Sequence, residues 1–171
     1  TGVQTCALPI SENHDNFGLA VMIFLVLFMG RHPYAGRYLG EGDMPIERAI
    51  REHRFAYGED RAFASTDQPP GTPPLEIVSA PVAQLFERAF SMANARAGRP
   101  TAVEWVSALE TLEARLVECP VGIAHWHVEG LVECPWCRME AATGVPLFSA
   151  AVSAAANPFD LPGLWRQLAE I

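Results

Sequence analysis

The chain has 171 residues, half of them hydrophobic and 19% charged, and this balance excludes a wholly disordered protein. Its 12 basic and 20 acidic residues give a net charge of −8, which argues against a nucleic-acid module that works by neutralising phosphates. Four cysteines are too few for a disulfide scaffold and no secretory signal pattern is present, so we expect a soluble, cytoplasmic, globular chain of about one domain.

Residues 1–10 differ from the rest of the chain because they carry no charge and no hydrophobic periodicity. This decapeptide resembles the translated reading frame of a common short-read sequencing adapter. We therefore expect residues 1–10 to be an artefact and the genuine sequence to begin near Ser11, with further sequence missing upstream. On this hypothesis Cys6 has no role, and three cysteines remain.

The most apolar run, residues 17–29, predicts a helix that has Asp15 or Asn16 as its N-cap and Gly30 just past its end. The run is apolar on all sides, so the helix is either buried on every side or placed in a membrane. Its 13 residues are fewer than the roughly 20 that a helix needs to span a bilayer. We therefore expect a central core helix and no membrane span.

A second helix is predicted to open at residues 43–45 and to end before Gly58. Its apolar face consists of Ile46, Ala49 and Ile50. Residues 59–74 include four prolines, which cannot sit inside a helix or a central strand. This stretch is predicted to be an irregular, stiff connector.

Two further amphipathic helices follow the connector. The third is capped by Ser79 with Pro81 in its first turn, and it ends before Gly98. Its apolar stripe consists of Val82, Leu85, Phe86, Ala89 and Phe90. The fourth opens with a capping box between Thr101 and Glu104. Its buried face is predicted to consist of Trp105, Val106, Leu109, Leu112 and Leu116.

Taken in order, these elements resemble the lower half of the C-lobe of bacterial, eukaryotic-like Ser/Thr protein kinases. Residues 15–21 and 30–34 are similar to that family's D-x-W/F-S/G-L-G/A-V … G-x-x-P-F/Y stretch. Residues 99–101, followed by Trp105 and Leu109, resemble its R-P-S/T … L signature near the end of the lobe. The resemblance covers about residues 12–117, and it implies a mainly α fold with a partial kinase C-lobe at 11–117.

The resemblance implies structural roles for two residues. Asp15 would hydrogen-bond to backbone amides of the catalytic loop, and Arg99 would pair with a glutamate at the end of the activation segment. Two simpler interpretations remain, in which Asp15 is a helix cap and Arg99 is a solvated surface charge.

The chain contains no glycine-rich phosphate loop, no strand lysine, no H-R-D-x-x-x-x-N and no D-F-G. Kinase chemistry needs those parts together with Mg²⁺, so ATP, Mg²⁺ and phosphoryl transfer to protein Ser/Thr would belong to a full-length parent. This chain would then be structural and would dock onto the missing N-terminal part of its own kinase domain, with a protein substrate or adaptor as a further partner. The alternatives are a pseudokinase and a zinc-stabilised helical protein-binding module.

A second constellation follows residue 117. Cys119, His125, Cys134 and Cys137 form the pattern C-x5-H-x8-C-x2-C. Three thiolates and one imidazole complete a tetrahedral zinc shell without an open position, so the pattern predicts a structural zinc site. A C-x-x-C redox pair is a rival hypothesis, but such a pair normally opens a helix after a strand, and residues 130–133 are a poor match for that strand. Reactive thiols or plain buried cysteines are the simplest alternative.

His125 and His127 compete for the fourth ligand position. The spacing to His125 resembles the C-x-x-N-x-x-H-x-Y … C-P-W-C tail attached to some bacterial kinase-like proteins, although in this sequence His127 stands at the aromatic position of that tail. The resemblance favours His125, and His127 stays open.

The C-terminal third is predicted to contain two segments. Residues 118–141 would form a small zinc-ribbon-like element, whose acidic residues outnumber its one arginine and argue against nucleic-acid binding. Residues 142–171 would form a flexible tail, with a linker and the start of a further helix.

Overall fold

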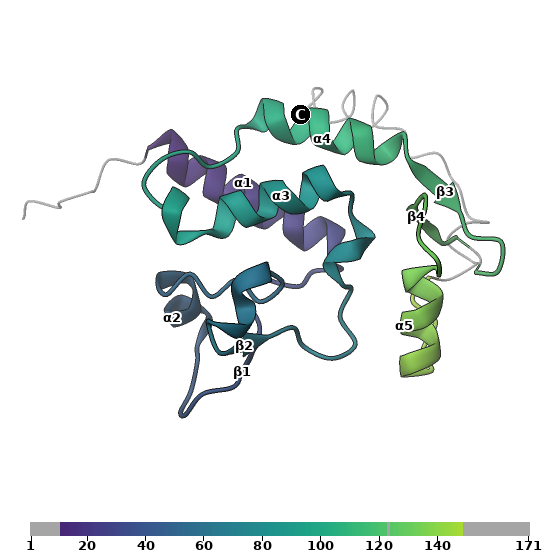
Figure 1. The fold of residues 1–171 in the computed structure, drawn as a ribbon, viewed down its shortest axis with the longest axis horizontal. Coiled ribbons are helices and arrows are strands. Elements are labelled where there is room, and N and C mark those ends of the chain that lie inside the picture. The colour runs from purple at the N-terminus through teal and green to yellow at the C-terminus, as the bar shows by residue number, and fades with distance from the viewer. Residues whose placement is uncertain (1–10, 123, 149–171) are drawn as a thin grey trace, which may run out of the picture.

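The structure is a computed structural model, and it describes residues 11–122 and 124–148 (Figure 1). The predictions for residues 1–10, for Cys6 and for the part of the tail beyond 148 lie outside the described residues.

Helix α1 spans Glu12–Leu27 and begins earlier than predicted. Ser11 is its N-cap, and the backbone N–H of Ser11 donates to Nδ1 of His14 at 3.3 Å. The prediction of Asp15 or Asn16 as N-cap is therefore wrong, because the polar pair that satisfies the helix start lies one turn upstream. Gly30 was predicted directly after the helix cap but lies one residue further on: Phe28 is the C-cap and Met29, with φ of +55°, follows it. Gly30 has φ of +78°, and its N–H donates to the Leu25 carbonyl at 2.7 Å.

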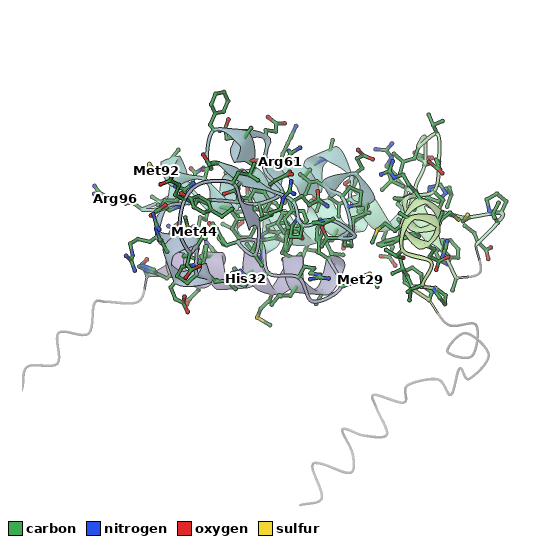
Figure 2. The ribbon with its side chains drawn as sticks, turned by 90° about the horizontal axis from the view of Figure 1, so that it is seen from below. Met29, His32, Met44, Arg61, Met92 and Arg96 are labelled. Atoms are coloured by element: carbon green, nitrogen blue, oxygen red, sulfur yellow. The ribbon has the colours of Figure 1, made fainter. Side chains whose placement is uncertain are left out.

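Helix α1 is not buried on every side by the described residues. One side, with Ala20, Phe24 and Phe28, is fully buried. The other side exposes Met22 by 66%, Val26 by 81% and Met29 by 46%; Figure 2 shows Met29 at the rim of the helical body. The expectation of complete burial is wrong for the part of the chain described, because only one face of α1 meets other helices.

Helix α2 spans Ile46–Arg51, and Ala49 is its buried residue. A small sheet was not predicted from the sequence: β1 (Arg37–Tyr38) pairs antiparallel with β2 (Thr66–Asp67). A Cβ at Gly36 would lie 2.4 Å from the Thr66 methyl carbon, so a glycine lets the two segments meet. The rest of the connector is irregular apart from the short 3-10 helix Glu59–Ala62.

Helices α3 (Ala80–Phe90) and α4 (Ala102–Glu113) confirm the predicted caps. Ser79 precedes α3, and Thr101 forms the capping box of α4: the Thr101 N–H donates to Glu104 Oε2 at 2.8 Å and the Glu104 N–H to Thr101 Oγ1 at 3.4 Å. Val106 is 55% exposed, and Leu116 lies in a strand beyond the end of α4, so the predicted places of both residues in the buried face of this helix are wrong.

Aromatic side chains fill the core where α1, α3 and α4 pack together (Figure 1). The Phe24 ring lies 3.9 Å from that of Phe28 and 5.0 Å from that of Phe86, and the Phe86 ring lies 4.9 Å from that of Trp105 (centroid distances). Edge-to-face and offset contacts of this kind add to the burial of apolar area. The core therefore holds α1 by one face to α3, and α3 in turn packs against α4.

A separate small element follows α4 at one end of the molecule (Figure 1). Strands β3 (Leu116–Glu118) and β4 (Trp126–Val128) form an antiparallel hairpin, and α5 (Pro135–Thr143) follows. Helix α5 was not predicted, and it runs across the predicted boundary at 141. Arg138 of α5 pairs with Glu76 of the helical body at 3.1 Å. The fold is thus rich in helix, as expected, with five α-helices and two small sheets in the described residues.

Among residues 11–122 and 124–148, no helix combines the length and the apolar character that crossing a membrane requires.

Candidate metal centre

Four side chains of ligand type meet between the hairpin and α5. Cys119 follows β3, His125 precedes β4, Cys134 is the N-cap of α5 and Cys137 lies in its first turn. Their ligand atoms all lie within 4.8 Å of one another. The fold therefore brings together the four residues predicted as ligands, and the cluster could bind a metal ion such as zinc.

The distances within the cluster fit the tetrahedral coordination of a metal ion. Sγ of Cys119 and Sγ of Cys137 are 3.6 Å apart, and Nδ1 of His125 is 3.4 Å from Sγ of Cys137 and 3.8 Å from Sγ of Cys134. Zinc bonds of about 2.3 Å to sulfur and about 2.0 Å to nitrogen imply ligand separations of about 3.8 Å between sulfurs and about 3.5 Å from sulfur to nitrogen. The donor atoms thus surround a space of the right size.

Backbone hydrogen bonds and a closely packed glycine fix the turn between Cys119 and His125. The Gly122 N–H donates to Sγ of Cys119 at 3.3 Å, and the Cys119 N–H donates to the His125 carbonyl at 2.9 Å. A Cβ at Gly122 would lie 2.0 Å from Nδ1 of His125, so no other residue fits without moving the imidazole. Ala124 has φ of +63°, which turns the chain just before His125.

Two thiols of the cluster have shifted pKa values, and the shifts have opposite signs. Backbone N–H groups of Gly122 and Val121 lower the pKa of the Cys119 thiol to about 6, whereas burial and the neighbouring thiols raise the pKa of Cys137 to about 12. Cys119 thus loses its proton readily, whereas Cys137 keeps its proton until a bound cation stabilises the thiolate. The donor set thus suits a thiophilic divalent metal.

Cys134 and Cys137 lie at the start of a helix that was not predicted from the sequence. Pro135 occupies the first helical turn, where its missing N–H costs nothing. A redox C-x-x-C pair also lies at the start of a helix. Here, however, Cys119 and His125 lie beside the two cysteines, so the cluster has four donor side chains rather than two. Four converging donors point to a metal centre rather than to a two-cysteine redox site.

His127 lies outside the cluster. Its Nδ1 is 3.0 Å from the carbonyl oxygen of Val128, its neighbour in β4. His125, in contrast, is 1% exposed and has its Nδ1 toward the sulfurs. The structure therefore brings His125, and not His127, to the three cysteines.

Glu140 was missed by the sequence analysis. Its Oε1 lies 3.2 Å from Nε2 of His125 and accepts the Leu147 N–H at 2.7 Å. That N–H bond and the His125 ring hold the pKa of Glu140 below its usual range, so the side chain remains a carboxylate. Glu140 follows Cys137 by three residues, which is one turn of α5; with a helix expected at Cys134, this spacing would have pointed to it.

The two positions carried over from the kinase resemblance lie apart from the metal centre. Asp15 is exposed in the first turn of α1. Arg99 is only 8% exposed, so it is not the solvated surface charge of the simpler interpretation. Its Nε donates to the Ala89 carbonyl at 3.0 Å, and its guanidinium carbon lies 4.6 Å from the Phe17 ring centroid.

Asn13 forms hydrogen bonds with Arg99 and with the loop before α4. It was not identified from the sequence. Its carbonyl oxygen accepts from the Arg99 guanidinium at 3.1 Å, and its Oδ1 accepts the Arg99 backbone N–H, also at 3.1 Å. Its amide donates to the carbonyls of Asn94 and Ala95. The start of α1 is therefore bound to the loop before α4 through Asn13 and Arg99.

Two curated proteins that match the chain are both named protein kinase YegI, one from Escherichia coli strain K12 and one from Escherichia coli O157:H7. Each is 40% identical to this chain over 131 residues, which is 76% of its length. The chain has a kinase-like relative. It spans 20% of the length of those relatives. No family model matches the chain, and no solved structure matches it.

The length of the YegI match bears on the metal element. An aligned stretch of 131 residues in a chain of 171 includes the residues from about 41 to about 131, wherever it starts. This region contains Arg99, Cys119 and His125. The similarity to YegI therefore continues past residue 117, from the helical body into the hairpin that carries two of the four candidate ligands.

Proposed function

We propose that this chain is the lower C-lobe part of a Ser/Thr protein kinase, followed by a structural zinc site. The observation that carries the proposal is the 40% identity over 131 residues to a protein named a kinase. Because the chain spans 20% of that relative, ATP-dependent phosphorylation of proteins, with Mg²⁺, is proposed for the full-length parent. The parent would be a transferase of the bacterial cytoplasm, where thiols stay reduced and available to zinc.

The uncovered face of α1 supports this proposal. Met22 and Val26 of α1, and Met29 just past its end, expose apolar surface, whereas Ala20 and Phe24 on the other side of α1 are fully buried. Contiguous apolar patches of this kind mark surfaces that another part of a protein covers. In the proposal, the upstream part of the kinase domain packs against this face of α1 and is the chain's first partner.

Arg99 supplies a second argument. Its side chain is buried, and within residues 11–122 and 124–148 no carboxylate lies within ion-pair distance of it. A buried guanidinium without a counter-ion is costly, so a partner carboxylate would stabilise it. We assign that partner to a glutamate of the upstream activation segment, and we assign Asp15, exposed at the start of α1, to amides of the catalytic loop.

In this chain the role is structural. The phosphate loop, the strand lysine and the catalytic-loop motifs do not occur in it, so its helices form a platform for the rest of the domain, for a substrate or for an adaptor. Cys119, His125, Cys134 and Cys137 would hold the zinc ion, which contributes folding free energy to an element too small to fold by its core alone.

The test is to amplify the source DNA outward from the segment that encodes residues 79–117 and to sequence it through the Ser11 junction. A glycine-rich loop, a strand lysine, H-R-D and D-F-G in the upstream frame are the expected result. If the upstream frame encodes a kinase-like region in which those motifs are degraded, the parent is a pseudokinase rather than an active kinase. A start codon followed directly by residues 1–10 would overturn the proposal and the artefact hypothesis, and it would favour an independent zinc-stabilised binding module.

A further inference from the structure

Glu140 makes two contacts through one oxygen atom. Its Oε1 lies 3.2 Å from Nε2 of His125 and 2.7 Å from the backbone N of Leu147. His125 belongs to the turn before β4, Glu140 to α5, and Leu147 to the segment that leaves α5. One carboxylate therefore connects three parts of the element around the imidazole.

The contact with His125 selects a tautomer. An acceptor at Nε2 requires the proton on that nitrogen, which leaves the lone pair of Nδ1 free. Nδ1 is the nitrogen that lies 3.4 Å from Sγ of Cys137 and 3.8 Å from Sγ of Cys134. Without Glu140, the Nε2–H of a histidine that is 1% exposed would lose its acceptor, and the ring would lose the contact that fixes its orientation.

The exit segment closes over the same ring. The Phe148 ring lies 5.3 Å from the His125 ring and 5.3 Å from the Trp136 ring, both near edge-to-face. The Leu147 N–H, bound to Glu140, anchors this segment one residue before Phe148. The positions of residues 147 and 148 are thus fixed by contacts with Glu140 and His125. The same contacts help to fix the Glu140 carboxylate and the His125 ring.

We propose that Glu140 is a positioning residue of the metal centre: it presents Nδ1 of His125 to the ion and couples metal binding to the ordering of residues 147–148. Carboxylates that bind the far nitrogen of a ligating histidine have this effect in metal sites generally. The inference rests on the proposed zinc site, and it adds a residue that is not itself a ligand. It also makes the path of the chain beyond α5 depend on metal.

The first experiment measures the Kd for zinc of the full chain by competition with a chromophoric chelator. Glu140→Ala is expected to weaken zinc binding about 10- to 100-fold, as loss of an outer carboxylate does. Glu140→Gln keeps an acceptor for Leu147 and for Nε2–H but loses the charge, so its Kd is expected between those of the parent chain and Glu140→Ala. Because Glu140→Gln preserves the contacts of the folded element, it also serves if the alanine variant fails to fold.

Glu133→Gln is the matched control. Glu133 is exposed next to Cys134, so the variant removes the same charge near the cluster without touching His125. Its zinc affinity is expected to equal that of the unmodified chain. An equal loss in Glu133→Gln and Glu140→Gln would show that charge alone acts, and it would overturn the positioning role.

A second readout separates positioning from general stability. ¹⁵N NMR of the zinc-bound chain is expected to show His125 bound through Nδ1 with its proton on Nε2, and zinc-bound Glu140→Ala is expected to show a mixture of Nδ1-bound and Nε2-bound rings. Hydrogen exchange at the Leu147 amide is expected to slow on zinc addition in the unmodified chain but not in Glu140→Ala. If the unmodified chain binds no zinc, the proposed site itself fails; if it binds zinc and Glu140→Ala binds it equally well, only the inference on Glu140 fails.

Discussion

Two histidines two residues apart have different surroundings, and the backbone explains why. Ala124, with φ of +63°, turns the chain so that the His125 ring meets the sulfurs, whereas His127 lies within β4 and its Nδ1 faces the Val128 carbonyl. The spacing of cysteines and histidines predicted the cluster and the family resemblance favoured His125, but neither excluded His127. A left-handed alanine is not a signal that a sequence carries, so the choice needed the folded turn.

Substitution at the cluster tests the ligand set. His125→Ala and Cys134→Ser are each expected to lower bound zinc, because three donors leave the tetrahedral shell incomplete. His127→Ala is the control and is expected to keep one zinc per chain, measured by elemental analysis after dialysis. Full retention in His125→Ala together with loss in His127→Ala would reverse the assignment.

Arg99 gives a stability prediction at the same scale. Arg99→Ala removes the donor from the carbonyls of Ala89 and Asn13, and the cost is expected to be about 2 kcal/mol or more in the free energy of unfolding. The measurement is urea denaturation of the full chain. Arg96→Ala is the control, because Arg96 is exposed and lies at the edge of the molecule in Figure 2. Equal urea midpoints for Arg99→Ala and Arg96→Ala would contradict the prediction that the buried Arg99 side chain stabilises the fold.

At the scale of elements, caps and periodicity predicted the four helices of the body, and local chemistry explains this success. The capping box of Thr101 and Glu104 and the stripe of α3 need only neighbours in sequence. The β1–β2 pair was missed because a two-residue ladder depends on a distant partner and on the space left by Gly36. Helix α5 was missed because Cys134 and Cys137 were interpreted as metal ligands alone, whereas Cys134 also caps a helix.

The cap of α4 gives a pH prediction. The Thr101 N–H, and next the Arg88 guanidinium, lower the pKa of Glu104 to about 2 from its ordinary value of 4.5. A carboxyl with a lowered pKa in the folded state stabilises the fold above its unfolded pKa, and this contribution is lost as the pH falls through the folded pKa. The unfolding free energy is therefore expected to decrease between about pH 4.5 and pH 2.

Glu104→Gln is expected to flatten that acid-side slope, measured by urea titrations at a series of pH values. Glu110→Gln changes an exposed carboxylate on the same helix and is expected to leave the slope as it is. An unchanged slope in Glu104→Gln would place the acid sensitivity elsewhere in the molecule.

At the scale of the whole molecule, the helical body and the metal element have different sources of stability. The body packs an aromatic core between α1, α3 and α4, while the element has a two-stranded hairpin, one helix and the candidate metal cluster. The chain passes from α4 into β3 within three residues, and Arg138 pairs with Glu76 across the junction. The order of the helical body and the metal element could be predicted from the sequence. The contact between them could not, because the Arg138–Glu76 ion pair depends on α5, which was not predicted.

The apolar face of α1 leads to a prediction for the chain on its own. Met22 and Val26 lie one turn apart on α1 and Met29 lies just past its end; all three are exposed, so this face offers apolar surface to any similar face that approaches it. The chain, expressed without further sequence, is therefore expected to self-associate at micromolar concentration, as measured by sedimentation velocity. Val26→Glu places a charge at the centre of that face and is expected to shift the population toward monomer, since burying an unpaired carboxylate opposes association.

Val103→Glu is the matched control, because Val103 on α4 is 78% exposed and Val26 is 81% exposed. The two variants add the same charge and remove the same side chain, so a general gain in solubility would appear in both. Dissociation in Val26→Glu alone would locate the contact on α1, on the face where the proposal places the upstream part of the kinase domain. A monomeric unmodified chain that unfolds cooperatively would show that α1 needs no further cover, and it would weigh against the kinase-fragment proposal while leaving the metal centre unaffected.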